Sequence, residues 1–254
     1  MTRAELLESC MDMGENLLVN GAEINRVEEA VERILCSYCV EGGSAFAIPS
    51  LLIVTLPDEE GRPMTHTIRV HERQTDLNKV DRLNDLCRRI CQNRPERERI
   101  VDELREIEAA PVYSSPVRIL AFALIGGSFA LLFGGSMGDG VCALICGMAI
   151  GCICRLVSGR MNLFFLDVLA SAVSALIALS SARLFPGLQS DKIIMGAFMN
   201  LVPGVAITTF IRDLIAGDLV AGAARLLEAL LIACAVAIGT GLVMSAFHLA
   251  GGLF

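Results

Sequence analysis

The chain has 254 residues, of which 54% are hydrophobic, and its formal net charge at pH 7 is −7. This acidic balance, without a basic stripe, argues against a nucleic-acid-binding protein. Only six of the 28 Asp and Glu residues and seven of the 21 Lys and Arg residues lie beyond residue 116. The first part is therefore expected to face water. The second part is too apolar for a soluble domain of its size and is expected to lie in a lipid bilayer.

The first part begins with a helical pattern and continues with strands. Apolar side chains recur at steps of three and four over residues 3–38, which predicts one long amphipathic helix with an interruption at Gly21. Three short runs rich in β-forming residues follow: 45–48, 51–56 and 65–70. Residues 58–61 have the composition of a turn between the second and third runs.

Two further helices are predicted before a linker that contains Pro111 and Pro116. The first has Thr75 as its N-cap and runs to about residue 93. The second opens at Pro95, because proline is favoured at the first helical position, and runs to about residue 107. The fold expected for residues 1–112 is an α+β cytoplasmic domain of helix, strands and helices.

Residues 113–254 are expected to form an all-α membrane domain of five transmembrane helices. Five apolar stretches are long enough to cross the hydrocarbon: 117–135, 140–157, 161–184, 192–211 and 219–249. Glycine and alanine recur within them. Helices in lipid pack closely through such small residues, which favours a bundle.

The orientation follows from the arginines. The start of the chain lacks the continuous apolar core of a signal peptide, so the N-terminus is expected in the cytoplasm. Cytoplasmic loops carry an excess of Lys and Arg, and five arginines then fall on the inner side: Arg118, Arg155, Arg160, Arg212 and Arg225. Five crossings place the C-terminus outside, in a multi-pass protein of the plasma (cytoplasmic) membrane, the inner membrane of a bacterial cell.

The fourth apolar stretch contains a helix breaker. Pro203 removes a backbone hydrogen bond, and Gly204 adds local freedom. Transporters place substrates at such breaks, where polar groups gather. Asn200, Thr208 and Thr209 supply neutral donors and acceptors nearby. A simple packing kink is the alternative interpretation.

Ionisable residues within the apolar stretches are costly and usually pair or serve transport. Asp167 is the most isolated of them, and Arg225 and Glu228 lie three apart on one helix face. The expected substrate or ion pathway has seven members: Asp167, Asn200, Pro203, Gly204, Thr208, Arg225 and Glu228. For Arg212, Asp213 and Asp218, interfacial positions at the membrane surface are the alternative.

Cysteines and histidines do not form a recognisable site. Cys36 and Cys39 form a CxxC pair, and Cys87 and Cys91 are one helical turn apart, so four thiolates would suit zinc. Nothing in the sequence brings the pairs together, so we expect buried structural cysteines and no metal or other cofactor. No nucleophile elbow, P-loop or dinucleotide fingerprint occurs, and we therefore do not expect an enzyme such as a membrane-embedded hydrolase.

Two groups of motifs resemble the threonine/serine exporter (ThrE-type) family. The stretch Gly21-Ala-Glu23-Ile-Asn-Arg26-Val-Glu28 resembles the family's front-helix motif. Leu201-Val-Pro-Gly204, the pairs Arg212-Asp213 and Gly217-Asp218, and then Arg225 and Glu228 resemble its fourth and fifth spans. We expect structural roles for eight of these positions: Gly21, Glu23, Arg26, Glu28, Arg212, Asp213, Gly217 and Asp218.

The resemblance implies a cytoplasmic front domain and the five-helix membrane half of a secondary exporter. Full-length members carry a second membrane half in the same chain. With five spans, this chain resembles the larger subunit of the split form, whose relatives are linked to succinate export. A second small membrane subunit is then the expected partner, besides the lipid bilayer and a small-molecule substrate.

The sequence therefore predicts a subunit of a proton-motive-force-linked exporter of threonine and serine, or of short dicarboxylates such as succinate. The alternative is a membrane-anchored sensor or regulatory subunit whose cytoplasmic domain binds a ligand. An anchor would not need Asp167, Asn200 and Glu228 inside its spans. The sequence leaves open the substrate, the coupling ion, the direction of transport, the role of the front domain and assembly into a homo-oligomer.

Overall fold

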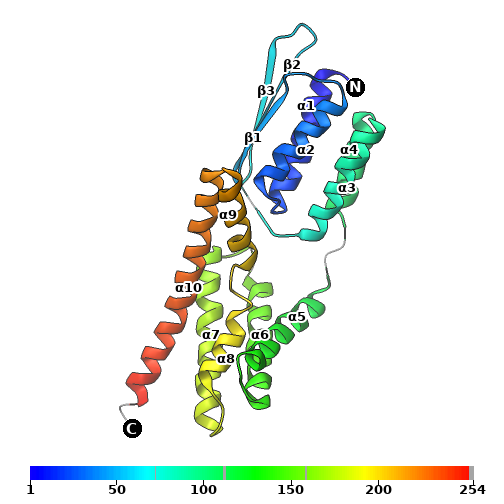
Figure 1. The fold of residues 1–254 in the computed structure, drawn as a ribbon. Helices are drawn as coiled ribbons and strands as arrows, with labels where there is room; N and C mark the ends of the chain where they lie inside the picture. The colour runs from blue at the N-terminus through cyan, green and yellow to red at the C-terminus, as the bar shows by residue number, and fades with distance from the viewer. Residues whose placement is uncertain (72, 111–112, 158, 252–254) are drawn as a thin grey trace. The chain divides into compact units, whose positions relative to one another are not determined.

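The computed structural model describes every residue except 72, 111–112, 158 and 252–254. The chain forms two compact units (Figure 1). The first unit comprises Met1–Pro111 with Thr208–Arg225, and the second comprises Val112–Ile207 with Leu226–Phe254. The domain boundary expected at residue 112 stays a prediction.

The first unit begins with two helices rather than one. α1 (Arg3–Val19) and α2 (Ile24–Ser37) are separated by a turn, so the prediction of one long helix over 3–38 is wrong. Gly21 adopts a φ of 85°, and the N–H of Ala22 donates to the carbonyl of Leu17 at 3.0 Å, which closes the end of α1. The segment after the sheet fixes this turn, because the N–H of Asp76 donates to the carbonyl of Asn20 at 3.1 Å.

The three strands lie where the sequence predicts them. β1 (Ser44–Ile48), β2 (Leu51–Pro57) and β3 (Pro63–Arg69) form an antiparallel sheet in the order β1-β2-β3. The turn between β2 and β3 is closed by Asp58, whose carboxylate accepts from the backbone N–H of Arg62 at 2.8 Å. Alternate residues of β2 are buried, so one face of the sheet covers the helices.

Both helices that follow the sheet begin slightly later than predicted. α3 (Leu77–Asn93) has Asp76 rather than Thr75 as its N-cap, and the Asp76 carboxylate accepts from the N–H of Lys79 at 3.0 Å. α4 (Arg97–Glu108) has Glu96 as its N-cap, so Pro95 precedes the helix instead of opening it.

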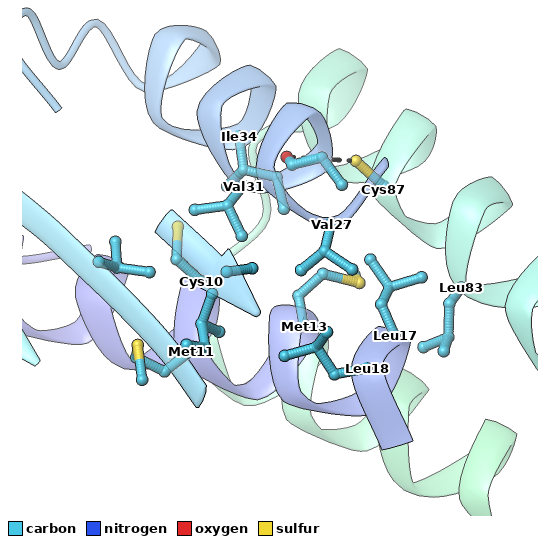
Figure 2. Packing of buried hydrophobic residues seen from close by; sticks show 14 of the residues in the cluster. Cys10, Met11, Met13, Leu17, Leu18, Val27, Val31, Ile34, Leu83 and Cys87 are labelled. Carbon is cyan, nitrogen blue, oxygen red and sulfur yellow. Dashed lines mark hydrogen bonds between the residues drawn. The ribbon is translucent and has the colours of Figure 1, made fainter. Parts of the chain in front are cut away.

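The core of the first unit is formed by α1, α2, α3 and the buried face of β2. Figure 2 shows Met13 and Leu17 of α1 beside Val27 of α2, with Leu83 of α3 nearby. The Cys87 thiol donates to the carbonyl of Ala30 at 3.6 Å and is buried, as expected. Cys36 and Cys39 are exposed, so the expectation of buried cysteines is wrong for that pair. Within the described residues no group of His, Cys, Asp or Glu could hold a metal ion.

Four helices in the described part of the chain are long and apolar enough to cross a membrane. They are α5 (Ser115–Leu132), α6 (Met137–Val157), α7 (Leu163–Leu184) and α10 (Leu219–Gly251). The protein is therefore a multi-pass membrane protein with an all-helical second unit. The fourth expected span, 192–211, is not a single helix. It covers most of α8 (Ser190–Phe198) and the start of α9 (Gly204–Ala216), so the count of five is not confirmed. The last two helices, α9 and α10, contribute residues to both units.

Small residues bring the helices of the second unit into close contact. A Cβ on Gly126 of α5 would lie 2.6 Å from the Ala143 carbonyl oxygen of α6. A Cβ on Gly196 of α8 would lie 2.6 Å from the carbonyl oxygen of Gly126. Gly239 of α10 lies directly against Ser171 of α7. This packing is the close approach that the small residues predict.

One carboxylate ties three segments of the second unit together. Asp139 is fully buried, and its Oδ2 accepts from the N–H of Ser136 at 2.7 Å while its own N–H donates to the Ser136 hydroxyl. This is a capping box at the start of α6. Its Oδ1 accepts from the N–H of Gln189, just before α8, at 2.7 Å. Asp139 thus fixes the α7–α8 connection to the start of α6.

Candidate functional site

The chain between α8 and α9 is interrupted at the predicted proline. The N–H groups of Leu201 and Val202 both donate to the Phe198 carbonyl, and α9 begins directly after Pro203, whose carbonyl accepts from Ile207 at 2.9 Å. The interruption is thus a full break over residues 199–203 rather than a bend in a continuous helix. Gly204 is the first residue of α9, at the end where the helix dipole is positive.

Asn200 lies inside this break and points a polar group into the packed interior. Its Nδ2 donates to the Ala197 carbonyl at 3.2 Å and lies 3.5 Å from the position a Cβ on Gly126 would take. Its Oδ1 is buried and accepts no hydrogen bond from any described residue. Buried acceptors are almost always paired, so this amide oxygen is a candidate contact for a ligand or a water molecule.

Asp167 is a buried carboxylate of the second unit. It lies in α7 with a relative exposure of 5%. Among the described residues it has no hydrogen bond or ion pair, whereas buried carboxylates in membrane helices are usually paired. The isolation that the sequence predicts for Asp167 is therefore present in the structure.

A cavity of about 200 Å³, which we call the arginine cavity, lies between α5, α6 and α7. It is lined by eight residues: Ser115, Arg118, Ile119, Phe122, Gly151, Cys154, Arg155 and Leu166. Asp167 directly follows Leu166 in the wall, and the Cys154 thiol is within electrostatic range of both Asp167 and Arg118. In the sequence, Arg118 and Arg155 indicate only the orientation of the spans, not a cavity. The sequence does contain a positional signal for this cavity: Arg118 lies near the start of one span and Arg155 near the end of the next. These two ends lie side by side when consecutive spans run antiparallel.

A second cluster, which we call the clasp, lies in the first unit. The guanidinium of Arg225 forms an ion pair with Asp213 at 3.1 Å, and its Nη2 donates to the Ala22 carbonyl at 2.8 Å. The backbone N–H of Ile24, at the start of α2, favours the charged form of the Asp213 carboxyl and so lowers its pKa. Arg212 forms an ion pair with Glu23 beside it. The clasp consists of Ala22, Glu23, Arg212, Asp213 and Arg225.

The Asp213–Arg225 pair of the clasp is buried, and burial affects the pKa of Asp213. Asp213 and Arg225 have relative exposures of 1% and 8%. Burial raises the pKa of the Asp213 carboxyl, while the guanidinium of Arg225 and the backbone N–H of Ile24 oppose this rise. Asp213 is therefore buried within the first unit, and its position relative to the membrane surface stays a prediction. Arg225, expected on the substrate pathway, is engaged in the clasp, and its role in transport stays a prediction.

The remaining motif residues support the elements around the clasp. Gly217 has a φ of 99° and ends α9, where the N–H of Asp218 donates to the Asp213 carbonyl at 2.9 Å. Glu28 accepts from the N–H of Ala47 at 2.7 Å, and burial raises its pKa, an effect that the charge of Asp218 increases. Arg26 forms an exposed ion pair with Glu23 at 3.6 Å.

Three further expected pathway residues belong neither to the clasp nor to the wall of the arginine cavity. Thr208 is exposed on α9, Glu228 is half-buried on α10, and Pro203 is half-buried before α9. Thr209, beside Thr208, is buried.

The front-helix motif and the motifs around the α9–α10 turn therefore lie in one structural unit. A comparison with known proteins supports the family resemblance of these motifs. The profile of the threonine/serine exporter family, ThrE, matches residues 8–247. The chain belongs to this family. A threonine/serine exporter from Corynebacterium glutamicum is 31% identical over 151 residues, which are 57% of this chain and 30% of that protein. No solved structure matches the chain. The ThrE family is one of transporters, and the resemblance drawn from the motifs is confirmed.

Proposed function

We propose that this ThrE-family chain is the larger membrane subunit of a secondary exporter of small polar metabolites that carry a carboxylate. Threonine and serine are the first candidates, and short dicarboxylates such as succinate are the second. The observation that carries the proposal is the break at residues 199–203, with a buried amide oxygen of Asn200 that no described residue satisfies. Backbone breaks at membrane depth occur where they line a cavity or a substrate site.

The proposed topology has five crossings, with the N-terminus in the cytoplasm and the C-terminus outside. Residues 192–211 form the fourth crossing as a discontinuous span made of α8 and the start of α9. The excess of arginines on one side supports this orientation. Reporter fusions after residue 114 and after residue 254 test it, because two reporters on the same side would refute an odd number of crossings.

The proposed carrier needs a second membrane subunit. A five-span half with opposite termini pairs naturally with a second half in inverted orientation, which places the substrate site between the halves. Asp167 is the proposed proton site, because it is a buried carboxylate within a membrane helix and the described residues give it no hydrogen bond or ion pair.

The first unit is proposed to act within the carrier rather than as an independent sensor. The clasp holds Thr208–Arg225, the turn between α9 and α10, in the same compact unit as the front helices. A sensor that only used the membrane helices as an anchor would not need a buried ion pair at that turn. The front domain is thus proposed to hold the turn in a defined position during transport.

Counterflow of labelled threonine, serine and succinate into vesicles tests the function. The chain is reconstituted alone and then with the small membrane protein encoded by the adjacent gene. Transport is expected only for the pair, and it should fall at least tenfold in the Asn200→Leu and Asp167→Asn variants. Asp191→Asn, at an exposed carboxylate, is the matched control. No counterflow of any of the three substrates by the pair would refute the exporter, and robust counterflow by the single chain would refute the need for a partner.

A further inference from the structure

The turn that ends α2 places two exposed cysteines three positions apart, Cys36 and Cys39. The N–H of Cys39 donates to the Cys36 carbonyl at 3.0 Å, and the N–H of Val40 donates to the Leu35 carbonyl at 3.1 Å. These two bonds form the Schellman motif that ends many helices. Such a turn holds its first and fourth Cα atoms within about 7 Å, which is also the upper limit for a disulfide. The Cα separation of Cys36 and Cys39 therefore permits a bridge.

Cys39 occupies the position in this turn where glycine is the usual residue. Its φ of 57° lies in the left-handed region, which side chains rarely adopt because their Cβ crowds the backbone. A glycine would close the same turn at less cost. The backbone conformation thus gives no reason for a cysteine at this position, whereas a chemical role for its thiol does.

A cavity of about 460 Å³, which we call the thiol cavity, lies between α2 and α3. It is lined by seven residues: Arg33, Cys36, Ser37, Cys87, Arg88, Cys91 and Gln92. Its volume is within the roughly 300–1,000 Å³ of small-molecule sites. Cys39 is not among the lining residues. A molecule in the cavity would therefore meet Cys36 first of the two exposed cysteines.

The other two thiols of the cavity are less accessible than that of Cys36. Cys91 is half-buried, and Cys87 is buried with its thiol donating to the Ala30 carbonyl at 3.6 Å. Burial raises the pKa of the Cys87 thiol well above its usual value, and the neighbouring Cys91 adds to this rise. Because the thiolate is the nucleophile, Cys87 is inert at neutral pH. Cys36 is thus the thiol of the cavity that is best placed to react.

Two guanidiniums also line the thiol cavity. Arg33 forms an ion pair with Glu29 and Arg88 forms one with Asp85, and all four side chains are more than half exposed. Exposed ion pairs contribute little free energy, so a carboxylate of a ligand can replace either acidic partner. The cavity therefore favours a ligand that carries carboxylates.

We propose that Cys36 and Cys39 form a reversible redox pair, whose substrate is a low-molecular-weight disulfide with carboxylates that binds in the thiol cavity. The Cys36 thiol loses its proton to water, and its thiolate attacks one sulfur of the disulfide R–S–S–R. The S–S bond breaks, a mixed disulfide forms on Cys36, and the released R–S⁻ takes up a proton.

The second step closes the bridge. The Cys39 thiol loses its proton, and its thiolate attacks the Cys36 sulfur of the mixed disulfide. The second R–S⁻ leaves and is protonated, and a Cys36–Cys39 disulfide remains. In total, two protein thiols lose two electrons and two protons, and one R–S–S–R becomes two R–SH.

The position of the pair agrees with a reversible modification. Both cysteines are exposed, and exposed disulfides are the labile and regulatory ones. The bridge would form when the ratio of small disulfide to thiol rises, and it would open when that ratio falls. This inference does not depend on the exporter's substrate, so transport and thiol chemistry can fail separately.

Glutathione disulfide, which carries several carboxylates, is the probe. The full chain in bilayer discs is incubated with it, the remaining thiols are blocked with iodoacetamide, and tryptic peptides are measured by mass spectrometry. Cys36 and Cys39 are the only cysteines in residues 34–69, so one peptide reports both. That peptide should lose two hydrogens and carry neither glutathione nor the blocking group. This product should form at least about tenfold faster than a glutathione adduct on the half-buried Cys91.

Variants separate the two steps. Cys39→Gly suits the left-handed turn, so it should leave the thermal midpoint unchanged or higher and accumulate glutathione on Cys36, because the second attack is impossible. Cys36→Ser should form no bridge. Cys152→Ser, at an exposed cysteine of the second unit, is the matched control and should form the bridge as the unmodified chain does.

A third variant tests the substrate class. Replacing Arg33 and Arg88 together by glutamine should slow the attack on glutathione disulfide by about two- to fivefold. The rate with hydroxyethyl disulfide, which carries no charge, should not change. An effect that is equal for the two reagents, or absent for both, would overturn the preference for carboxylates.

Other results would overturn the redox pair itself. A bridge from Cys36 to Cys87 or Cys91 would assign the chemistry to the wrong partner. Glutathione adducts of equal yield in the wild type and in Cys39→Gly would exclude the second step. Glutathione adducts that form on Cys152 as fast as on Cys36, without a bridge, would show unselective reaction of exposed thiols.

Discussion

Replacing Arg225 by methionine is expected to open the start of α2. The substitution removes the ion pair to Asp213 at 3.1 Å and the bond to the Ala22 carbonyl at 2.8 Å, and it leaves a carboxylate with 1% exposure. Removing one partner of a buried ion pair costs about 3–5 kcal/mol. Amide hydrogen exchange over residues 22–27 should therefore accelerate by about two to three and a half orders of magnitude. The measurement is peptide-level exchange of the full chain in detergent.

Three further variants test whether the buried pair is the cause. Asp213→Asn keeps its volume and leaves Arg225 its bond to Ala22, so its effect should lie near the lower limit of about 3 kcal/mol. The double variant Asp213→Leu with Arg225→Met removes both charges and should cost less than either single change. Arg26→Gln, in an exposed pair, is the control and should change exchange by less than about 1 kcal/mol.

The effect of Arg225→Met should depend on pH. Burial already raises the pKa of Asp213, and loss of the guanidinium removes the main opposing influence. An acid whose folded-state pKa is raised stabilises the fold when it is protonated, and this stability is lost as the pH rises through the folded-state pKa. Protection in the variant, corrected for intrinsic exchange rates, should therefore increase between pH 7 and pH 5. Exchange in Arg225→Met that matches Arg26→Gln at both pH values would refute the clasp as a stabilising element.

Three other predictions concern the second unit and are read as thermal midpoints of the full chain in detergent. Gly196→Ala should destabilise the fold by about 1–3 kcal/mol, because its Cβ would meet the Gly126 carbonyl. Gly241→Ala, which has open space around it, should stabilise the fold by about 0.5–1 kcal/mol. Equal thermal midpoints for the two variants would contradict the close packing of α5 and α8. Asp139→Ala should cost about 2–4 kcal/mol, since it removes the carboxylate that accepts from the N–H groups of Ser136 and Gln189. A midpoint within one degree of wild type would rule out that role. Asn200→Leu should leave the midpoint unchanged or higher, because it removes an unsatisfied oxygen, so a lower midpoint would indicate a structural rather than a ligand-binding role.

Local patterns in the sequence predict the helices and strands that depend only on residues close together in the chain. The three strands and their turn follow from residue composition, because alternate burial on one face of a sheet leaves a period of two. The break at Pro203 follows from the missing N–H of proline. The apolar stretches give α5, α6, α7 and α10 almost to the residue, since a span is set by its length and lack of charge.

The sequence by itself thus determines a membrane protein with a mixed front domain and assigns it to a transporter family by its motifs. Only the tertiary structure decides which of these motifs meet. The turn at Gly21 depends on hydrogen bonds from residues 74 and 76, and the clasp joins Ala22 to Arg225 across 203 positions. The arginine cavity likewise exists only because α5 and α6 run antiparallel and bring Arg118 and Arg155 to one end. Such contacts depend on chain topology, which no local period or spacing in the sequence encodes.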